Sequence, residues 1–317
     1  MERHRIRHIT KYIYPAPVTD SANQIMLYPV NDARQTVKHH ELAITGRPAV
    51  EAFADYYGNT VGTFSIIRPH HELVIDSTVE VEVEPTAPPA DDGRASAQWE
   101  ALKAVQGTSP YLDFLFQDRC ASREEILAEV TRIAAPGVTP LGAVLGLADF
   151  VNASLAYRKG VTSVESSTDE VWNLKAGVCQ DFAHLLLLML RMAGIPARYV
   201  SGYVCPKNHE MRGEGATHAW AEAFIPGCGW LGIDPTNNSI VSDRHVRLAF
   251  GRSFADCTPV KGTYRGTGEH TLNVSVRIES GPTGSAPPVY STEVRREEPS
   301  SNSYRKFLEF QQQQQQQ

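Results

Sequence analysis

The sequence predicts an α+β protein in which an antiparallel β domain precedes a unit of helices packed on an antiparallel sheet. Three patterns support this fold class. Residues 5–84 are dominated by alternating apolar and polar positions, which is typical of half-buried strands. Residues 97–156 carry apolar side chains at helical spacing. A third helix begins near Cys179, and three strand-like segments follow it, so helices and strands are segregated along this part of the chain.

The N-terminal segment, residues 1–84, is expected to form the β domain. Its last strand ends in Val79-Glu80-Val81-Glu82-Val83, a strict period of two, and the Asp55 to Thr60 segment supplies a turn between two strands. Residues 85–96 are rich in Pro, Ala and Asp and are interpreted as a linker.

Residues 97–280 are expected to hold the helical segment and the functional core. The apolar helix stops at Gly194-Ile195-Pro196, as helices that end at a glycine commonly do. Strands are predicted at 197–204, 218–225 and 230–234, with a last one at 271–278. Residues 281–317, rich in Gly, Pro and Ser and ending in seven glutamines, are expected to be a disordered tail.

Composition narrows the classes of partner. The 317 residues carry a formal net charge of −6, which argues against nucleic acid as a partner. No apolar run approaches the ~20 residues of a membrane-spanning helix, so no membrane partner is expected. The N-terminus lacks the apolar stretch of a secretory signal, and a cytoplasmic location is predicted. Five cysteines without a CxxC pair fit neither a disulfide framework nor a four-thiolate zinc site.

One cysteine stands at a position suited to chemistry. A helix N-terminus favours the thiolate form of a cysteine, and Cys179 lies at the predicted helix start. A thiol nucleophile also needs a base and a group that orients the base. His218 is the first residue of the predicted strand 218–225, and Asp234 is the last residue of the predicted strand 230–234. A hairpin between these two strands could bring both side chains together.

The segments around these residues resemble a known family. They read Gly177-Val178-Cys179-Gln180-Asp181-Phe182-Ala183, Gly194-Ile195-Pro196-Ala197-Arg198-Tyr199-Val200-Ser201-Gly202-Tyr203, Thr217-His218-Ala219-Trp220, Gly229-Trp230 and Asp234-Pro235-Thr236-Asn237. Together they are similar to the core of the bacterial transglutaminase-like proteins, and Tyr57-Gly58-Asn59 is similar to the β domain that precedes this core in many members. The resemblance implies a papain-related core with Cys179 as nucleophile, His218 as base and acid, and Asp234 as orienting carboxylate. One departure lies at 251–256, where an acidic residue is expected nearer position 253.

Other residues have a structural interpretation beside a functional one. Trp172, Trp220 and Trp230 could line an acyl pocket, although aromatic packing explains at least two of them as well. Asp181 is expected to cap the helix or to touch substrate. His184 lies roughly 140° round the helix from Cys179 and is expected to be a buried polar contact. The remaining four cysteines are expected to be inert.

The predicted activity is amide chemistry through a thioester on Cys179. Hydrolysis of a peptide or amide bond in a peptide or protein substrate is favoured, because water is the default acceptor. Transglutaminase-type transfer to an amine uses the same three residues and stays open. A non-catalytic binding module is the second alternative. No cofactor is expected, since nucleotide-binding motifs are missing from the sequence, and no metal site, since paired-ligand spacings are missing too.

Overall fold

A computed structural model describes residues 1–87, 89–91, 93–205, 212, 217–266 and 269–281, and the backbone of 289–299. The chain divides into two compact units, each described here by itself. One unit is built from residues 84–213 and 217–257 and holds all three residues of the predicted site. The other joins residues 2–83 to the segment that starts at Thr258. Among the described residues, no helix has the length and apolar character to cross a membrane.

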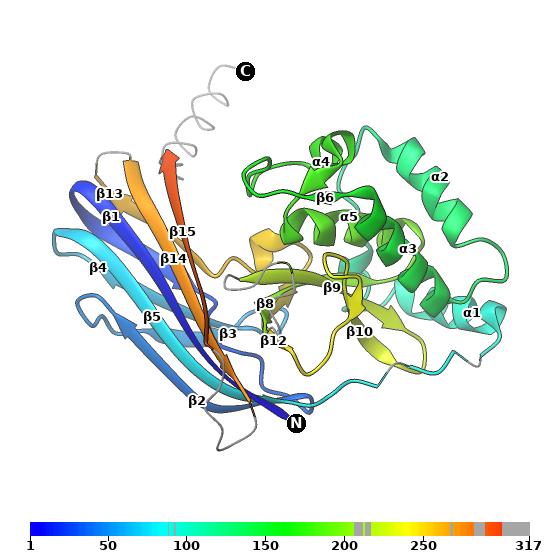
Figure 1. Cartoon of the computed structure of the whole chain (residues 1–317), viewed down its shortest axis with the longest axis horizontal. Helices are drawn as coiled ribbons and strands as arrows, with labels where there is room; N and C mark the ends of the chain where they lie inside the picture. The colour runs from blue at the N-terminus through cyan, green and yellow to red at the C-terminus, as the bar shows by residue number, and fades with distance from the viewer. Residues whose placement is uncertain are drawn as a thin grey trace. The chain divides into compact units, whose positions relative to one another are not determined.

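The β unit is an eight-stranded antiparallel sheet. Its strands are β1 (Glu2–Ile25), β2 (Gln35–Ile44), β3 (Glu51–Ala54), β4 (Thr60–Ile66), β5 (His70–Val83), β13 (Val260–Arg265), β14 (Glu269–Ser280) and β15 (Val289–Pro299) (Figure 1). The long strand β1 is the hub of the sheet, because its first half pairs with β5 and β14 and its second half pairs with β4 and β13.

The alternation in β5 confirms the period of two expected from the sequence. Val79, Val81 and Val83 are buried, while Glu80 forms a 2.6 Å ion pair with Arg3 on the neighbouring β1. One face of the strand therefore packs in the core, and the other is satisfied by cross-strand charges.

The C-terminal part of the chain differs from the sequence-based interpretation. Strands β13 and β14 pair with β1, so the other unit ends at Cys257, whereas the sequence predicts a core that extends to residue 280. Within the expected disordered tail, residues 289–299 form β15, which pairs with β14. Without β15, the edge of β14 would leave its backbone N–H and C=O groups unpaired, so a segment able to form a strand pairs there. The composition of the segment does not indicate that such an edge is available. The glutamine end, 311–317, lies outside the described residues.

The second unit packs helices on a five-stranded antiparallel sheet of order β11-β10-β9-β8-β12. The helices are α1 (Ala95–Gln106), η1 (Asp113–Leu115), α2 (Arg123–Ile133), α3 (Pro140–Ser154), α4 (Thr168–Leu174), α5 (Cys179–Met192) and η2 (Phe254–Asp256). The strands of the sheet are β8 (Ala197–Val204), β9 (His218–Ile225), β10 (Gly229–Asp234), β11 (Ser239–Ile240) and β12 (His245–Gly251), and a short parallel pair is formed by β6 (Ala156–Tyr157) and β7 (Ala176–Gly177).

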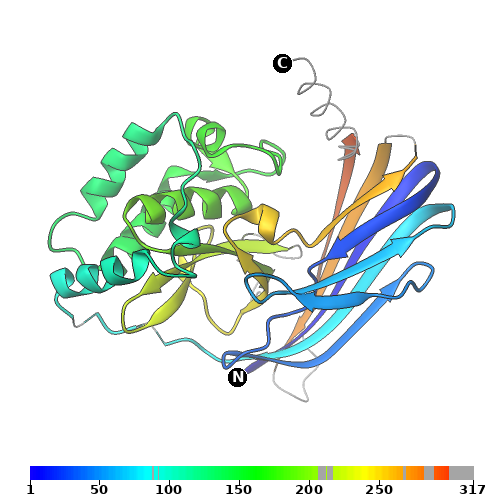
Figure 2. The same cartoon turned by 180° about the vertical axis from the view of Figure 1, so that it is seen from behind.

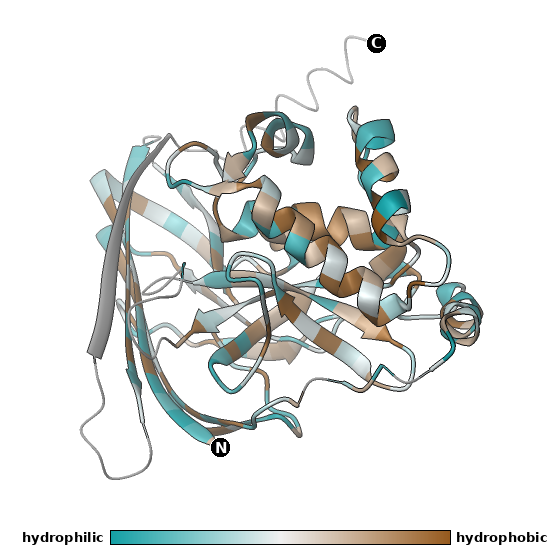
Figure 3. Ribbon diagram, turned by 45° about the vertical axis from the view of Figure 1, so that its right-hand side comes forward, coloured by the Kyte–Doolittle hydropathy of each residue, from teal (hydrophilic) through white to brown (hydrophobic). Residues whose placement is uncertain are grey.

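Helix α5 is the centre of this unit. It lies on β8 and β9, and α2, α3 and α4 pack against it (Figure 2). Its residues from Phe182 to Leu190 are buried apart from His184, and hydrophobic residues are concentrated in the helices that lie on the sheet (Figure 3). The helix ends at Met192, and Gly194 follows with φ of 80°, a left-handed conformation that glycine adopts without strain.

The departure noted at 251–256 has a local explanation. No acid stands at 253, but the carboxylate of Asp256 accepts a 2.8 Å hydrogen bond from the backbone N–H of Arg252. The backbone oxygen of Arg252 in turn accepts a hydrogen bond from the buried guanidinium of Arg191 on α5. This loop is therefore tied to the helix without an acid at the expected position.

Candidate active site

Cys179 is the first residue of α5, as the sequence predicts, and is half-buried. The turn before it is fixed by Asp181, whose carboxylate accepts hydrogen bonds from the Val178 N–H (2.7 Å) and the Thr162 hydroxyl (2.7 Å). A Cβ on Gly177 would overlap the Asp181 side chain, so glycine is required there. Burial raises the pKa of Asp181, and hydrogen bonds from Thr162 and Val178 lower it. Asp181 therefore caps the helix that carries the sulfur.

His218 and Asp234 meet as the hairpin geometry predicts. His218 is the first residue of β9 and Asp234 the last of β10, and the two strands pair antiparallel. His218 Nε2 lies 2.8 Å from Asp234 Oδ2, and both side chains are fully buried. A charged pair this deeply buried stays stable only with close geometry and further hydrogen bonds.

The electrostatics of His218 link it to both partners. Burial lowers the pKa of His218, but the neighbouring Asp234 and Cys179 raise it to about 10. Burial also opposes ionisation of Asp234, yet its pKa lies far below the usual range because of His218 and His245. His218 Nδ1, the nitrogen not bound to Asp234, makes no hydrogen bond of ordinary geometry with the described residues. The charge of the Cys179 sulfur therefore raises the pKa of His218, although no ordinary hydrogen bond joins the sulfur to the imidazole.

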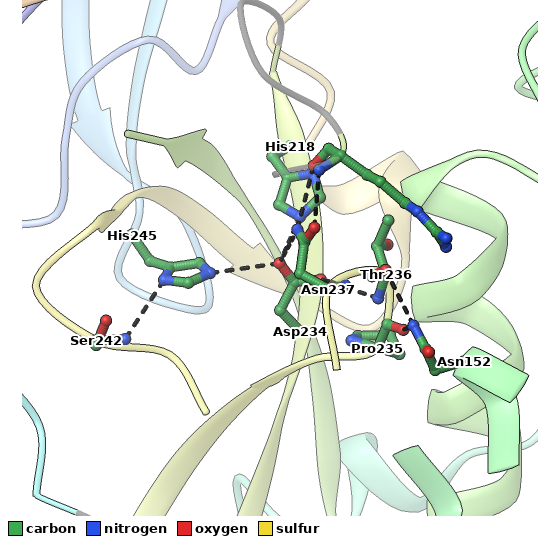
Figure 4. Close-up of polar contacts among 9 residues, drawn as sticks. Asn152, His218, Asp234, Pro235, Thr236, Asn237, Ser242 and His245 are labelled. Carbon is green, nitrogen blue, oxygen red and sulfur yellow. Dashed lines mark hydrogen bonds and ion pairs between the residues drawn. The ribbon is translucent and has the colours of Figure 1, made fainter. Parts of the chain in front are cut away.

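Asp234 accepts hydrogen bonds beyond its contact with His218. Its Oδ1 accepts from the backbone N–H groups of Thr236 (3.0 Å) and Asn237 (3.2 Å), and its Oδ2 accepts from Asn237 Nδ2 (2.8 Å) (Figure 4). An aspartate that bonds to backbone two and three residues on is a common turn device, so the Asp-Pro-Thr-Asn segment carried a signal for this role. These bonds hold the carboxylate in one orientation.

A second histidine, His245, also contacts Asp234, a contact that the sequence does not predict. Its Nε2 lies 3.4 Å from Asp234 Oδ2, and its Nδ1 accepts from the backbone N–H of Ser242 at 3.4 Å (Figure 4). Because Nδ1 accepts, Nε2 carries the proton and donates to the carboxylate. Burial lowers the pKa of His245, which keeps the ring neutral. No local sequence pattern indicates this role, because His245 lies on β12 and Asp234 on β10, and the two strands are separate segments of the chain.

The turn after Asp234 is anchored from two sides. Asn152 on α3 donates to the backbone oxygens of Pro235 (2.8 Å) and Thr236 (3.0 Å). Asn237 accepts from the backbone N–H of Arg212 at 2.8 Å and donates to its oxygen at 3.1 Å. Asn237 therefore joins the carboxylate to a residue of the β8–β9 connection.

The three tryptophans take different positions. Trp172 on α4 donates from Nε1 to Glu125 at 2.9 Å, and Trp230 packs against Phe114 and Phe224. Only Trp220 lies beside the predicted site, with its ring 6.2 Å from that of His218. It is 0% exposed, and Gly202 opposite His218 has no room for a Cβ against this ring. The contacts of Trp172 and Trp230 are packing contacts.

The remaining polar candidates lie in structural contacts. His184 accepts a hydrogen bond from the Phe254 N–H (3.2 Å), and burial lowers its pKa to about 4. Cys205 and Cys257 are buried, and burial, followed by the neighbouring Asp169, raises the pKa of Cys120 to about 11. Within the described part of the chain, no group of three His, Cys, Asp or Glu residues could hold a metal ion.

Comparisons with known proteins identify the family. Residues 128–235 match the transglutaminase-like superfamily, and residues 4–82 match the bacterial transglutaminase-like N-terminal region. An uncharacterised protein of Mycobacterium leprae is 34% identical over 88% of this chain and 99% of its own length. The chain belongs to the transglutaminase-like superfamily. The resemblance seen in the sequence and the fold class it implied are thereby confirmed.

Two further relatives of this transglutaminase-like protein carry functional descriptions. The crystal structure of a candidate cysteine protease from Cytophaga hutchinsonii covers 92% of this chain and 98% of its own, with a TM-score of 0.68 and 20% identity, and so shows a shared fold. A protein-glutamine gamma-glutamyltransferase of Pseudomonas aeruginosa is 33% identical over 36% of this chain and 18% of its own length. Members of the superfamily are typically enzymes.

Proposed function

We propose that this transglutaminase-like protein is a thiol enzyme that cleaves amide bonds through a thioester on Cys179. The observation that carries the proposal is the buried pair of His218 and Asp234, 2.8 Å apart, whose imidazole also feels the charge of the Cys179 sulfur. An imidazole protonated at neutral pH stabilises a neighbouring thiolate, which is the form of cysteine that attacks carbonyl carbon.

The reaction runs in two halves. The Cys179 sulfur bonds to the carbonyl carbon, the C–N bond breaks, and His218 gives its proton to the leaving amine. Water then attacks the thioester, His218 accepts a proton from it, and the C–S bond breaks to release the acid. Asp234 keeps the imidazole oriented and stabilises its charged form throughout. A peptide or protein is the proposed substrate, and the proposed location is the cytoplasm.

Transfer to an amine is the second candidate. The same thioester would be attacked by a primary amine in place of water, after glutamine had released ammonia. The similarity to a protein-glutamine gamma-glutamyltransferase of Pseudomonas aeruginosa favours this alternative, although it covers only 36% of the chain. Hydrolysis remains the first choice, because keeping water from a thioester requires a closed site.

Thiol labelling tests the proposal against a non-catalytic binding module. Iodoacetamide is applied near pH 6, and modified cysteines are mapped by mass spectrometry. We expect selective modification of Cys179 that is lost in His218→Ala. The four other cysteines serve as internal references, and labelling of all five at similar rates would support the binding module.

A product assay separates hydrolysis from transfer. Glutamine-containing peptides are incubated with the protein, with and without a primary amine, and ammonia release and product mass are followed. The Cys179→Ala variant provides the blank. We expect ammonia release with glutamate in place of glutamine, or cleaved peptide products. Amine incorporation that outpaces hydrolysis would instead establish the transferase.

A further inference from the structure

The thioester chemistry proposed above needs two hydrogen-bond donors for the oxygen that becomes negatively charged. Such an oxyanion is stabilised by donors that already point to the place where charge develops. Cys179 supplies one, because the N–H groups in the first turn of α5 have no acceptor within the helix. The second donor has to come from outside that helix turn.

Two nearby side chains are poorly suited to this task. Gln180 Nε2 already donates to the backbone oxygen of Val164 at 3.3 Å. Trp220 Nε1 has no hydrogen-bond partner in the part of the chain that the structure describes, but its ring is 0% exposed. A substrate oxygen could reach that nitrogen only if the core around the ring opened.

Tyr157 is placed differently. Its strand β6 pairs with β7, with Tyr157 opposite Gly177, two residues before Cys179. The Arg158 N–H donates to the Gly177 oxygen at 2.9 Å, which fixes this register. The ring centroid lies 6.3 Å from that of Phe182, in the first turn of α5. The tyrosine therefore flanks the helix start that carries the sulfur.

The Tyr157 hydroxyl is also free to donate. The side chain is only partly buried, and no hydrogen bond of its hydroxyl is found among the described residues. Burial, together with the charges of Cys179 and Asp234, raises the pKa of Tyr157 to about 12 against the opposing effect of Arg212. The phenol consequently keeps its proton at neutral pH, within the electric field of the site.

We propose that the Tyr157 hydroxyl is the second oxyanion donor, acting together with the backbone N–H of Cys179. As the sulfur–carbon bond forms, the carbonyl electron pair moves onto oxygen, and both donors bind that oxygen without giving up their protons. When the pair returns to re-form the carbonyl, the bond to the leaving group breaks and both hydrogen bonds weaken. Tyr157 is then a catalytic residue that contacts the reacting oxygen. This assignment rests on the proposed function of Cys179.

Two reagents for the same sulfur separate this role from thiol activation. p-Nitrophenyl acetate reacts through a tetrahedral oxyanion and releases p-nitrophenolate, leaving an acetyl thioester on Cys179. Iodoacetamide alkylates the sulfur by displacing iodide, with no oxyanion on the carbonyl. Both rates are measured at pH 7 for the full-length wild type and for Tyr157→Phe. Tyr199→Phe is the matched control, because that hydroxyl also lies within range of the Cys179 charge but its residue is only 2% exposed.

Removal of one oxyanion donor slows acyl transfer by about 100-fold. We therefore expect Tyr157→Phe to lose about that factor with p-nitrophenyl acetate and to keep the iodoacetamide rate within about twofold. Tyr199→Phe should retain both rates. Equal losses with both reagents, an unchanged acylation rate, or a comparable acylation loss in Tyr199→Phe would overturn the assignment. A wild-type Cys179 that reacts with neither reagent would instead refute the proposed function itself.

Discussion

Replacing Asp234 by asparagine tests the electrostatic basis of the proposed activity. The amide oxygen of the asparagine can still accept hydrogen bonds from the N–H groups of Thr236 and Asn237. Its amide nitrogen would replace Oδ2, which now accepts a hydrogen bond from Asn237 Nδ2. His218 would lose the negative charge beside Nε2. Burial, which lowers the pKa of His218, would then dominate, and the imidazole would be neutral at pH 7.

The size of the effect follows from the charged pair. Raising the pKa of His218 from 6.5 to about 10 corresponds to a preference for the charged ring on the order of 5 kcal/mol, to which Asp234 is the largest favourable contributor. Without an imidazolium, a thiol of ordinary pKa, about 8.5, is about 1% thiolate at pH 6.5. We therefore expect Asp234→Asn to alkylate at Cys179 about 100-fold more slowly at that pH.

The assay is the rate of iodoacetamide modification of Cys179 between pH 5 and 10, with circular dichroism to verify folding. Asp149→Asn is the matched control, because Asp149 accepts a 3.0 Å hydrogen bond from Asn238 in the same turn without touching His218. A folded Asp234→Asn protein that reacts within threefold of wild type at pH 6.5 would refute the reasoning. Recovery of its rate above pH 9 is expected, since any thiol ionises there.

Three further predictions concern the same region. The pKa of His218 is raised on folding, so its contribution to stability is complete below about pH 6.5 and is lost as pH rises toward 10. Urea titrations should therefore show that the difference in unfolding free energy between wild type and Asp234→Asn shrinks over that range. A difference that stays constant with pH would contradict this. In Gly202→Ala, the new Cβ would overlap the Val246 backbone oxygen and the Trp220 ring, which should cost about 2 kcal/mol or more of unfolding free energy, whereas an unchanged urea midpoint would argue against the close approach. In Asn237→Ala, Asp234 loses a 2.8 Å donor, and alkylation at pH 6.5 should slow by about fivefold, a loss not shared by Asn238→Ala.

Much of the secondary structure of both units could be predicted because its signals are local. Gly194 and Pro196 mark the end of α5, and the alternation in β5 marks its buried face. Cys179 at a helix start and His218 and Asp234 at the ends of a hairpin needed only these elements and their order. In such cases the period of the pattern and the turn residues carry the information.

Strand partners could not be predicted in the same way. β14 pairs with β1, from which most of the chain separates it, and β15 adds to β14 within a segment whose composition suggested disorder. An alternating pattern predicts that a segment forms a strand, but it does not predict which other strand pairs with it. The unit boundary near Cys257 depends on that choice of neighbour.

The sequence by itself determined the order of the proposed nucleophile, base and carboxylate, because each stands at a helix or strand end that local patterns reveal. The tertiary structure alone decided what surrounds them. His245 reaches Asp234 from β12, and Tyr157 flanks Cys179 through the pairing of β6 with β7. These contacts join backbone segments that touch only after the sheet and helices have packed, and hydrogen bonds between such segments leave no periodic trace in the chain.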